Sequence, residues 1–266
     1  MPAKNSTTRL AIVIALMAVV SSRADAQDSD IQQKLANPIA SLTIVPIQVN
    51  YDANIGPTRD GYKITTNLQP VIPYKLNNDW TLVTRTIVPI VAQYEISPGA
   101  GDQFGLGDTL QSFFFVPQTI DGFTWGVGPA LLWRTGTHRL LTTGKWAAGP
   151  TAVALQQTGP WTVGLLANHI WSFAGDENRA DVSSTYVQPF VAYAASGGWT
   201  YTLNTESTYN WTAEQWSVPV NFQISKLTKF GDQPVSLQAG VKYWAESPDS
   251  GAHGWGARLA LTFILP

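Results

Sequence analysis

From about residue 41 to its end, the sequence repeats one pattern of short segments in which apolar and polar side chains alternate. Alternation with a period of two is typical of a β-strand whose two faces meet different surroundings. Segments of this kind, separated by turn-forming residues, predict about twelve strands. The expected strands cover residues 42–54, 62–74, 80–94, 108–117, 123–134, 146–157, 161–173, 182–194, 199–211, 216–226, 235–246 and 254–265. One helical spacing, at Ile31, Leu35 and Ile39, precedes them.

The connections between these segments alternate in length. Short connections lie at residues 76–79, 118–122, 158–160 and 196–198, and longer ones lie at 54–61, 95–107, 135–145, 174–181 and 247–253. Two connections blur this pattern, since 212–215 is short and 227–234 is long. Short turns at one end and long loops at the other are typical of outer-membrane β-barrels, which fits an even number of antiparallel strands.

The composition narrows the class of protein further. Charged residues make up 13% of the chain, about half the roughly 25% of soluble domains, while the hydrophobic fraction is an ordinary 44%. The net charge of −2 argues against a nucleic-acid partner. The absence of cysteine excludes a disulfide framework, a thiolate metal site and a cysteine nucleophile.

The first residues have the features of a secretory signal peptide. Lys4 and Arg9 precede the apolar run at residues 10–20, and Ala-Asp-Ala at residues 24–26 forms a small-x-small cleavage site. We expect cleavage to leave Gln27 as the mature N-terminus. The alternative is an uncleaved membrane anchor, but the apolar run is short for a hydrocarbon layer of about 30 Å.

The tryptophans fall near the ends of the expected strands. Trp161 and Trp171 bracket one strand, and their spacing corresponds to about 25 Å for a tilted strand. Indole rings prefer the interface between bilayer and water. We therefore predict an interface girdle, against the alternative of a soluble β-sandwich with core aromatics. The girdle would contain Trp80, Trp125, Trp133, Trp146, Trp161, Trp171, Trp199, Trp211, Trp216, Trp244 and Trp255.

The charged residues in the middle of the strands share the polar face. A charge facing lipid would cost about 2–4 kcal/mol at the midplane, so this face is expected to line the interior. The predicted lumen-lining or solute-binding residues are Lys63, Asn67, Arg85, Asn204, Glu206, Lys242 and Arg258. They leave a positive excess that favours acidic solutes. The alternative is an interior filled by ion pairs. Trp244 lies on the same strand face as the polar residues, which argues against its place in the girdle.

Two features do not fit a regular transport barrel. Proline cannot donate to a strand ladder, yet it recurs inside the expected strands at Pro46, Pro70, Pro73, Pro89, Pro129, Pro150, Pro189 and Pro219. His169 and Ser172 suggest a nucleophilic pair of a lipid-hydrolysing barrel, but they lie on opposite faces of one strand. The loop acids Asp102, Asp108, Asp176 and Glu177 are candidates for binding calcium or bridging lipopolysaccharide at the outer rim. The favoured interpretation is that they are solvated loop side chains. We expect no catalytic residue, no metal and no cofactor.

A family resemblance agrees with the barrel. The stretches QFGLGDTLQSFFF (103–115), KWAAGPTAVALQQTGPWTVGLLANHIWSFAGD (145–176), TLNTESTYNWTAEQWSVPVN (202–221) and QPVSLQAGVKYWAESP (233–248) carry it. They resemble a family of Gram-negative exported proteins labelled "transporter" and grouped with the MetA-pathway phenol-degradation proteins, some of them mislabelled neuromedin U. The resemblance implies an outer-membrane location and passage of small organic, including aromatic, molecules. It brings no catalytic motif.

The sequence thus predicts a cleaved signal peptide at residues 1–26, a periplasmic or plug-like segment at 27–40, and an all-β transmembrane antiparallel barrel at 41–266. The hypothesis for its function is an outer-membrane, porin-like channel or transporter for small organic, aromatic or acidic solutes, and not an enzyme. Outer-membrane lipids and lipopolysaccharide are its expected partners. The alternatives are a barrel enzyme that acts on lipids and a structural or adhesive barrel. The oligomeric state is left open.

Overall fold

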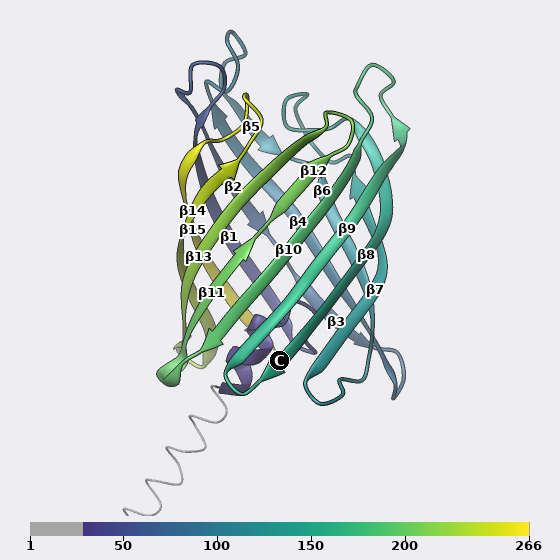
Figure 1. Ribbon diagram of the computed structural model, residues 1–266, viewed down its shortest axis with the longest axis vertical. Helices are drawn as coiled ribbons and strands as arrows, with labels where there is room; N and C mark the ends of the chain where they lie inside the picture. Colours follow the sequence, from purple (N-terminus) through teal and green to yellow (C-terminus); the bar gives the residue numbers. More distant parts are fainter. Residues whose placement is uncertain (1–28, 266) are drawn as a thin grey trace, which may run out of the picture.

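The computed structural model describes residues 29–265, so the expected signal peptide lies outside the described residues. The chain folds into a closed barrel of 12 antiparallel strands, as the sequence predicts (Figure 1). Three barrel strands are interrupted, so the elements are β1 (Thr43–Ile55), β2 (Gly61–Leu68), β3 (Val71–Lys75), β4 (Trp80–Tyr94), β5 (Gln103–Leu106), β6 (Thr109–Pro117), β7 (Phe123–Trp133), β8 (Lys145–Thr158), β9 (Trp161–Gly175), β10 (Ser183–Ala194), β11 (Trp199–Thr205), β12 (Ser207–Asn210), β13 (Gln215–Phe230), β14 (Gln233–Glu246) and β15 (Gly254–Leu265).

The barrel closes where its first and last strands meet. The register of β1 on β15 runs antiparallel from Thr43 opposite Leu265 to Tyr51 opposite Ala257. Every other neighbouring pair is a sequential antiparallel connection. Closure pairs the edges that an open sheet would leave exposed, which a membrane-spanning sheet requires because lipid offers no hydrogen bonds.

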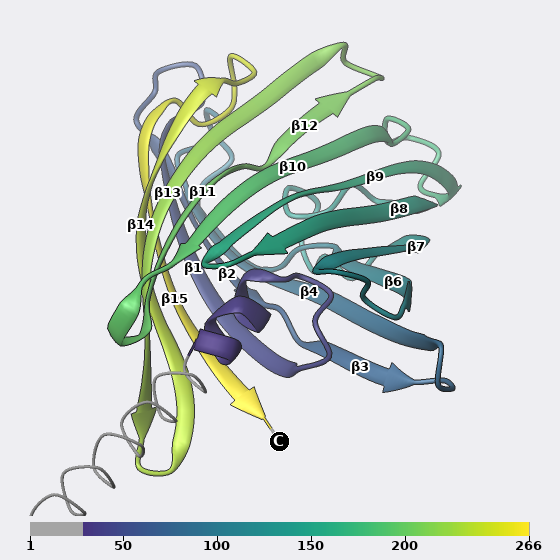
Figure 2. The same ribbon diagram turned by 60° about the horizontal axis from the view of Figure 1, so that its bottom comes forward.

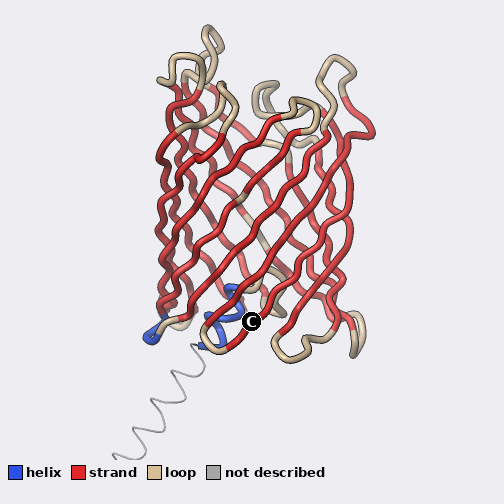
Figure 3. Tube along the Cα trace, viewed as in Figure 1, coloured by secondary structure: helices blue, strands red, loops and turns tan. Residues whose placement is uncertain are grey.

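Short and long connections lie at opposite ends of the barrel. Figure 3 shows the long loops at the top and the tight turns at the bottom, the end at which the C-terminus lies. The prediction of a long connection at 227–234 is wrong. β13 continues to Phe230, which pairs with Gln233 across a tight turn. Gly231 takes a φ of +61° there, a conformation that glycine adopts without strain.

Each break in a strand lies opposite a proline of a neighbouring strand. Between β2 and β3, Gln69 N–H donates to the Pro46 carbonyl at 2.9 Å. Between β5 and β6, Gly107 N–H donates to the Pro89 carbonyl at 2.9 Å. Between β11 and β12, Glu206 N–H donates to the Pro219 carbonyl at 3.4 Å.

The physical reason is that a residue pair in an antiparallel ladder normally exchanges two hydrogen bonds. Proline accepts one but has no N–H to return the other, so the ladder is interrupted at its partner. The neighbouring backbone is also irregular, with a register shift between Val218 and Pro219. Three of the prolines that disagree with regular strands are thus accommodated by breaks in the facing strands.

The two faces of the wall have different compositions. The outer face exposes apolar side chains along the strands, among them Val163 and Leu165 on β9 and Phe222 on β13. The inner face carries most of the buried polar side chains, such as Asn50, Asn221 and Arg258. This is the reverse of a soluble protein and the expected arrangement for a barrel in the outer membrane.

The barrel interior is itself divided. On β3, β4, β6 and β8 to β10 the inner face carries a hydrophobic cluster that includes Val83, Phe114, Leu155 and Leu166. The inner faces of β1, β13, β14 and β15 are mainly polar, with Asn50 and Arg258 as examples. The apolar side chains of the interior are therefore concentrated on one side of the barrel, where polar residues such as Ser112 and Asn168 accompany them. The two strands that carry Asn50 and Arg258 lie on the more polar side.

A helical segment precedes the barrel. Residues 29–36 are helical and lie at the end of the barrel where the tight turns are, as Figure 2 shows. Ile39, just after the helix, joins the hydrophobic cluster of the interior. Among residues 29–265, no helix has the length and apolar character needed to cross a membrane.

Candidate functional site

A bidentate ion pair crosses the barrel interior. Arg258 of β15 donates from Nη1 and Nη2 to the two carboxylate oxygens of Glu206 at 2.8 and 2.7 Å. Its Nε donates to Asn50 Oδ1 at 2.7 Å. Glu206 lies at the break between β11 and β12 and keeps the inward parity of Asn204, two residues before it. Both terminal nitrogens of the guanidinium are bonded to the carboxylate, and this bidentate geometry fixes the orientation of both side chains.

A second buried ion pair lies on β1 and β14. Lys242 Nζ is 3.0 Å from Asp52 Oδ1, and both side chains are almost fully buried. The same oxygen accepts a hydrogen bond from the indole N–H of Trp244 at 2.9 Å. Trp244 therefore bonds to an interior carboxylate, and its place in the predicted interface girdle is wrong. A register shift in β13 opposite Trp244 accompanies this position.

Arg85 and Lys63 are the expected interior cations outside these pairs. Arg85 Nη2 donates to Gln69 Oε1 at 3.1 Å, and neither cation forms an ion pair with any carboxylate of residues 29–265. Lys63 lies opposite Asp52 in the register of β2 on β1. The structure thus divides the four predicted cations into two that are neutralised and two that are not.

The predicted amides lie on the same inner face. Asn204 accepts a hydrogen bond at 2.8 Å from the side chain of Asn221, an interior residue that the sequence reasoning did not single out. Asn67 pairs in register with Gln48. The Asn221 Oδ1 and Gln223 Nε2 atoms are buried without a hydrogen-bond partner among the described residues. Buried polar atoms without partners are rare unless water or a ligand reaches them.

An interior cavity of about 320 Å³ has Arg85, Glu206 and Asn67 among its polar lining residues. Leu110, Leu132 and Ile170 are among its apolar ones. We call this space the mid-barrel chamber. Its remaining lining residues are Gln48, Gln69, Ile87, Ser112, Leu166, Asn168, Ser184, Tyr186 and Thr208.

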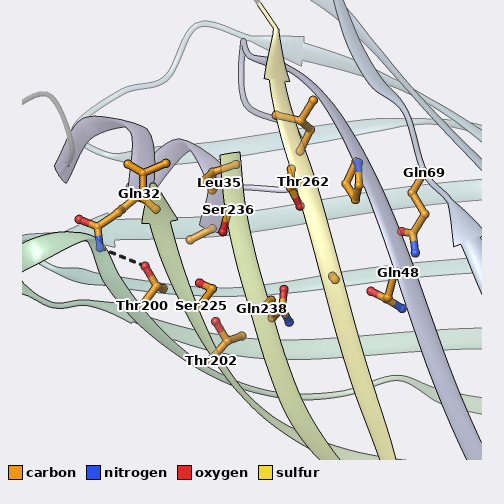
Figure 4. A pocket seen from close by; sticks show the side chains of 15 residues that line it. Gln32, Leu35, Gln48, Gln69, Thr200, Thr202, Ser225, Ser236, Gln238 and Thr262 are labelled. Atoms are coloured by element: carbon orange, nitrogen blue, oxygen red, sulfur yellow. Dashed lines mark hydrogen bonds between the residues drawn. The ribbon is translucent and has the colours of Figure 1, made fainter. Parts of the chain in front are cut away.

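Two smaller cavities of about 170 and 180 Å³ lie between the mid-barrel chamber and the helical segment. The first shares Gln48 and Gln69 with the chamber, and the second shares Arg85 with it. Both reach Leu35 of the helical segment. Figure 4 shows the first, with glutamine, serine and threonine side chains from the barrel wall around it and Gln32 and Leu35 at its edge.

The helical segment is fastened to the barrel by both of its glutamines. Gln32 Nε2 donates to the Trp199 carbonyl at 2.7 Å and to Thr200 Oγ1 at 3.2 Å. Gln33 Nε2 donates to the Gly159 carbonyl at 2.7 Å. With Ile39 buried in the interior cluster, residues 29–40 cover part of the barrel mouth.

At the other end, the loop between β7 and β8 contacts the rim. The inward-facing Gln93 donates to the Leu140 carbonyl at 3.3 Å. The carboxylate of Asp108 accepts from Thr142 Oγ1 and from the backbone and hydroxyl of Thr143, all at 2.7 Å. Asp108 thus fixes this loop. No cluster of three or more possible metal ligands occurs in the part of the chain that the structure describes.

Most tryptophans lie on the outer face. All the predicted girdle positions except Trp133 and Trp244 have well-exposed side chains. They pack with other aromatics along the two rims, as in the edge-to-face pair of Trp80 and Trp125 with centroids 6.1 Å apart. Lys226 lies 5.0 Å from the ring centroid of Trp199 and donates to the Gly197 carbonyl, at the end with the tight turns.

The candidate catalytic pair is not assembled. His169 is on the outer face of β9 and its Nδ1 is 2.6 Å from Thr185 Oγ1. Ser172 Oγ instead donates to Asp181 at 3.1 Å. The two side chains therefore have different partners on different sides of the wall.

Comparison with solved structures gives the same architecture. An outer membrane channel from Pseudomonas putida F1 superposes with a TM-score of 0.67 at 16% identity, covering 85% of this chain and 96% of that one. The NanC porin has a TM-score of 0.52 at 12% identity, covering 83% of this chain and all of the other. No protein-family model and no curated protein sequence matches the chain. The protein has the fold of an outer-membrane β-barrel.

Proposed function

We propose that this protein is an outer-membrane channel or transporter for small organic solutes, with a path through the barrel interior. The observation that carries the proposal is the series of interior cavities that share lining residues from the mid-barrel chamber to the helical segment. A barrel filled only for stability would not need three cavities in sequence with unpartnered polar atoms beside them. The shared fold with an outer membrane channel and a porin supports this proposal.

The solute-facing charge is that of Arg85 and Lys63, because Lys242 and Arg258 are neutralised by Asp52 and Glu206. The expected lining amides Asn67 and Asn204 complete the polar lining. A positive excess lowers the barrier for anions and raises it for cations. The resemblance to the transporter family grouped with MetA-pathway phenol-degradation proteins supports small organic molecules as the solutes.

Residues 27–40 act in this proposal as a plug at the periplasmic end. The exposed tryptophans form the interface girdle and contact outer-membrane lipids. Contact of the outer rim with lipopolysaccharide through Asp102, Asp176 and Glu177 stays a prediction.

We prefer transport to lipid hydrolysis because the side chains of His169 and Ser172 are not hydrogen-bonded to each other and have different partners.

The test is single-channel conductance of the refolded mature protein in a planar bilayer, with and without small aromatic acids. We expect stable conductance steps that prefer anions. Arg85→Glu should shift the selectivity toward cations, whereas Arg139→Glu, on an exposed loop residue, should leave it near the parent value. Absence of conductance from a chain shown to be folded by heat-modifiable gel mobility would contradict the proposal.

A further inference from the structure

The mid-barrel chamber has both charged and apolar lining residues, and this combination indicates which class of ligand it can bind. Its lining combines the charged side chains of Arg85 and Glu206 with the apolar side chains of Leu110, Leu132 and Ile170. The volume of about 320 Å³ is at the lower end of the roughly 300–1,000 Å³ of ligand pockets. The chamber therefore suits one small molecule with a polar end and an apolar body.

The charge of the polar end follows from the ion pairs. Both carboxylate oxygens of Glu206 are bonded to Arg258, so this acid is neutralised within the wall. Arg85 has one hydrogen bond, to Gln69, and no ion-pair partner among residues 29–265. Since a guanidinium has five N–H donors, several of those on Arg85 remain for a ligand. Its planar fork matches a carboxylate better than a neutral group.

We propose that the mid-barrel chamber is a binding site for a small amphipathic monocarboxylate, whose carboxylate bonds to Arg85 and whose apolar body packs on Leu110, Leu132 and Ile170. This inference rests on the proposed channel function, since the chamber lies on the proposed path. A dicarboxylate is disfavoured because Arg85 is the only cation among the lining residues, so a second carboxylate would have no ion-pair partner in the chamber. A purely apolar solute would leave the donors of Arg85 unpaired.

Benzoate is a suitable probe, with benzamide as its neutral analogue and acetate as a carboxylate without an apolar body. Binding is measured by isothermal titration calorimetry on the refolded mature protein in detergent. Benzoate should bind more tightly than either analogue. Arg85→Gln should weaken benzoate binding at least about tenfold, as expected for a lost charge-assisted pair. Arg85→Lys should retain part of the affinity because it keeps the charge and loses the fork.

The contribution of the apolar lining residues is tested by Leu132→Asn, which should weaken benzoate binding and leave acetate binding unchanged. If Leu132→Asn fails to fold, Leu132→Ala serves the same purpose without a new polar group. Arg139→Gln is the matched control for Arg85→Gln and should bind benzoate like the parent protein. Equal affinities for benzoate and benzamide, no effect of Arg85→Gln, or no benzoate binding by the folded protein would each overturn the inference.

Conductance of the same samples separates the two proposals. Conductance without benzoate binding would remove the chamber as a monocarboxylate site and leave the channel in place. Benzoate binding that depends on Arg85 in a folded barrel without conductance would support the site and overturn the channel.

Discussion

Arg258 and Glu206 join β15 to the break between β11 and β12 across the barrel interior, through two hydrogen bonds of 2.7 and 2.8 Å. Glu206 occupies the break itself. Glu206 N–H bonds to the carbonyl of Pro219, which cannot return a hydrogen bond, and the acid projects beside Arg258. The bidentate ion pair of the interior thus lies beside a break in the strand ladder.

Replacing Glu206 with Gln should therefore destabilise the barrel strongly. The Arg258 side chain is almost fully buried, and removing its partner leaves a buried charge without compensation. Loss of one member of a buried pair typically costs about 3–5 kcal/mol. Urea unfolding of the refolded barrel, followed by tryptophan fluorescence, measures the change in the free energy of unfolding.

The control for this prediction is Glu214→Gln, which removes an exposed loop charge and should change stability little. The double variant Glu206→Gln with Arg258→Met removes both charges and should recover much of the loss. A double variant no more stable than Glu206→Gln would show that the charge of Arg258 is not the cause.

Weakening the helical segment should increase conductance. Gln32→Ala removes three hydrogen bonds to the barrel, and Ile39→Ala removes apolar contacts of a side chain that is 2% exposed. We expect larger or more frequent open states in planar bilayers for both variants. Lys34→Ala, which removes only a solvent-exposed pair with Asp30, should behave like the parent protein. Unchanged conductance in the double variant Gln32→Ala with Ile39→Ala would argue against a plug.

The tryptophans should differ in their contact with lipid. In variants that retain a single tryptophan, brominated phospholipids should quench Trp171 strongly, because its side chain is 52% exposed on the outer face. Trp244, bonded to Asp52 inside the barrel, should be quenched much less. Equal quenching of Trp171 and Trp244 would contradict the inward position of Trp244.

The loop acid Asp181 should titrate below the usual range. Its hydrogen bonds to Lys145 and Ser172, together with the charge of Lys145, hold the pKa of the Asp181 carboxyl below its ordinary value. A lowered carboxyl pKa stabilises the fold above the ordinary pKa, and this contribution is lost as the pH falls through the lowered value. Carbon-13 NMR of labelled aspartate should show the low midpoint, and Lys145→Gln should raise it.

Lys75→Gln, at the opposite end of the barrel, is the control for this titration and should leave the Asp181 midpoint in place. High salt should also move the midpoint upward, since the Asp181 side chain is 77% exposed and its ion pair with Lys145 is open to screening. If neither Lys145→Gln nor high salt moved the Asp181 midpoint, the ion pair with Lys145 would not be the cause of the lowered pKa.

Much of the fold could be predicted from local pattern. Period-two alternation and turn residues predict all twelve barrel strands within a few residues, because each strand of a barrel must satisfy lipid on one face and the interior on the other. The longest error is at residues 227–234, where β13 continues to Phe230 and β14 begins at Gln233. The prolines signalled irregularity, but only the register shows that Pro46, Pro89 and Pro219 face the three breaks.

The sequence by itself determined the class of structure, the inward face of the charged residues and the outward face of most tryptophans, since these follow from parity along one strand. The tertiary structure alone decided which charges neutralise each other, because Arg258 and Glu206, or Lys242 and Asp52, meet only when the barrel closes. It also decided that Arg85 keeps free donors in a cavity that apolar side chains share, and that residues 29–40 enter the barrel mouth. These are contacts between strands distant in sequence, which no local pattern encodes.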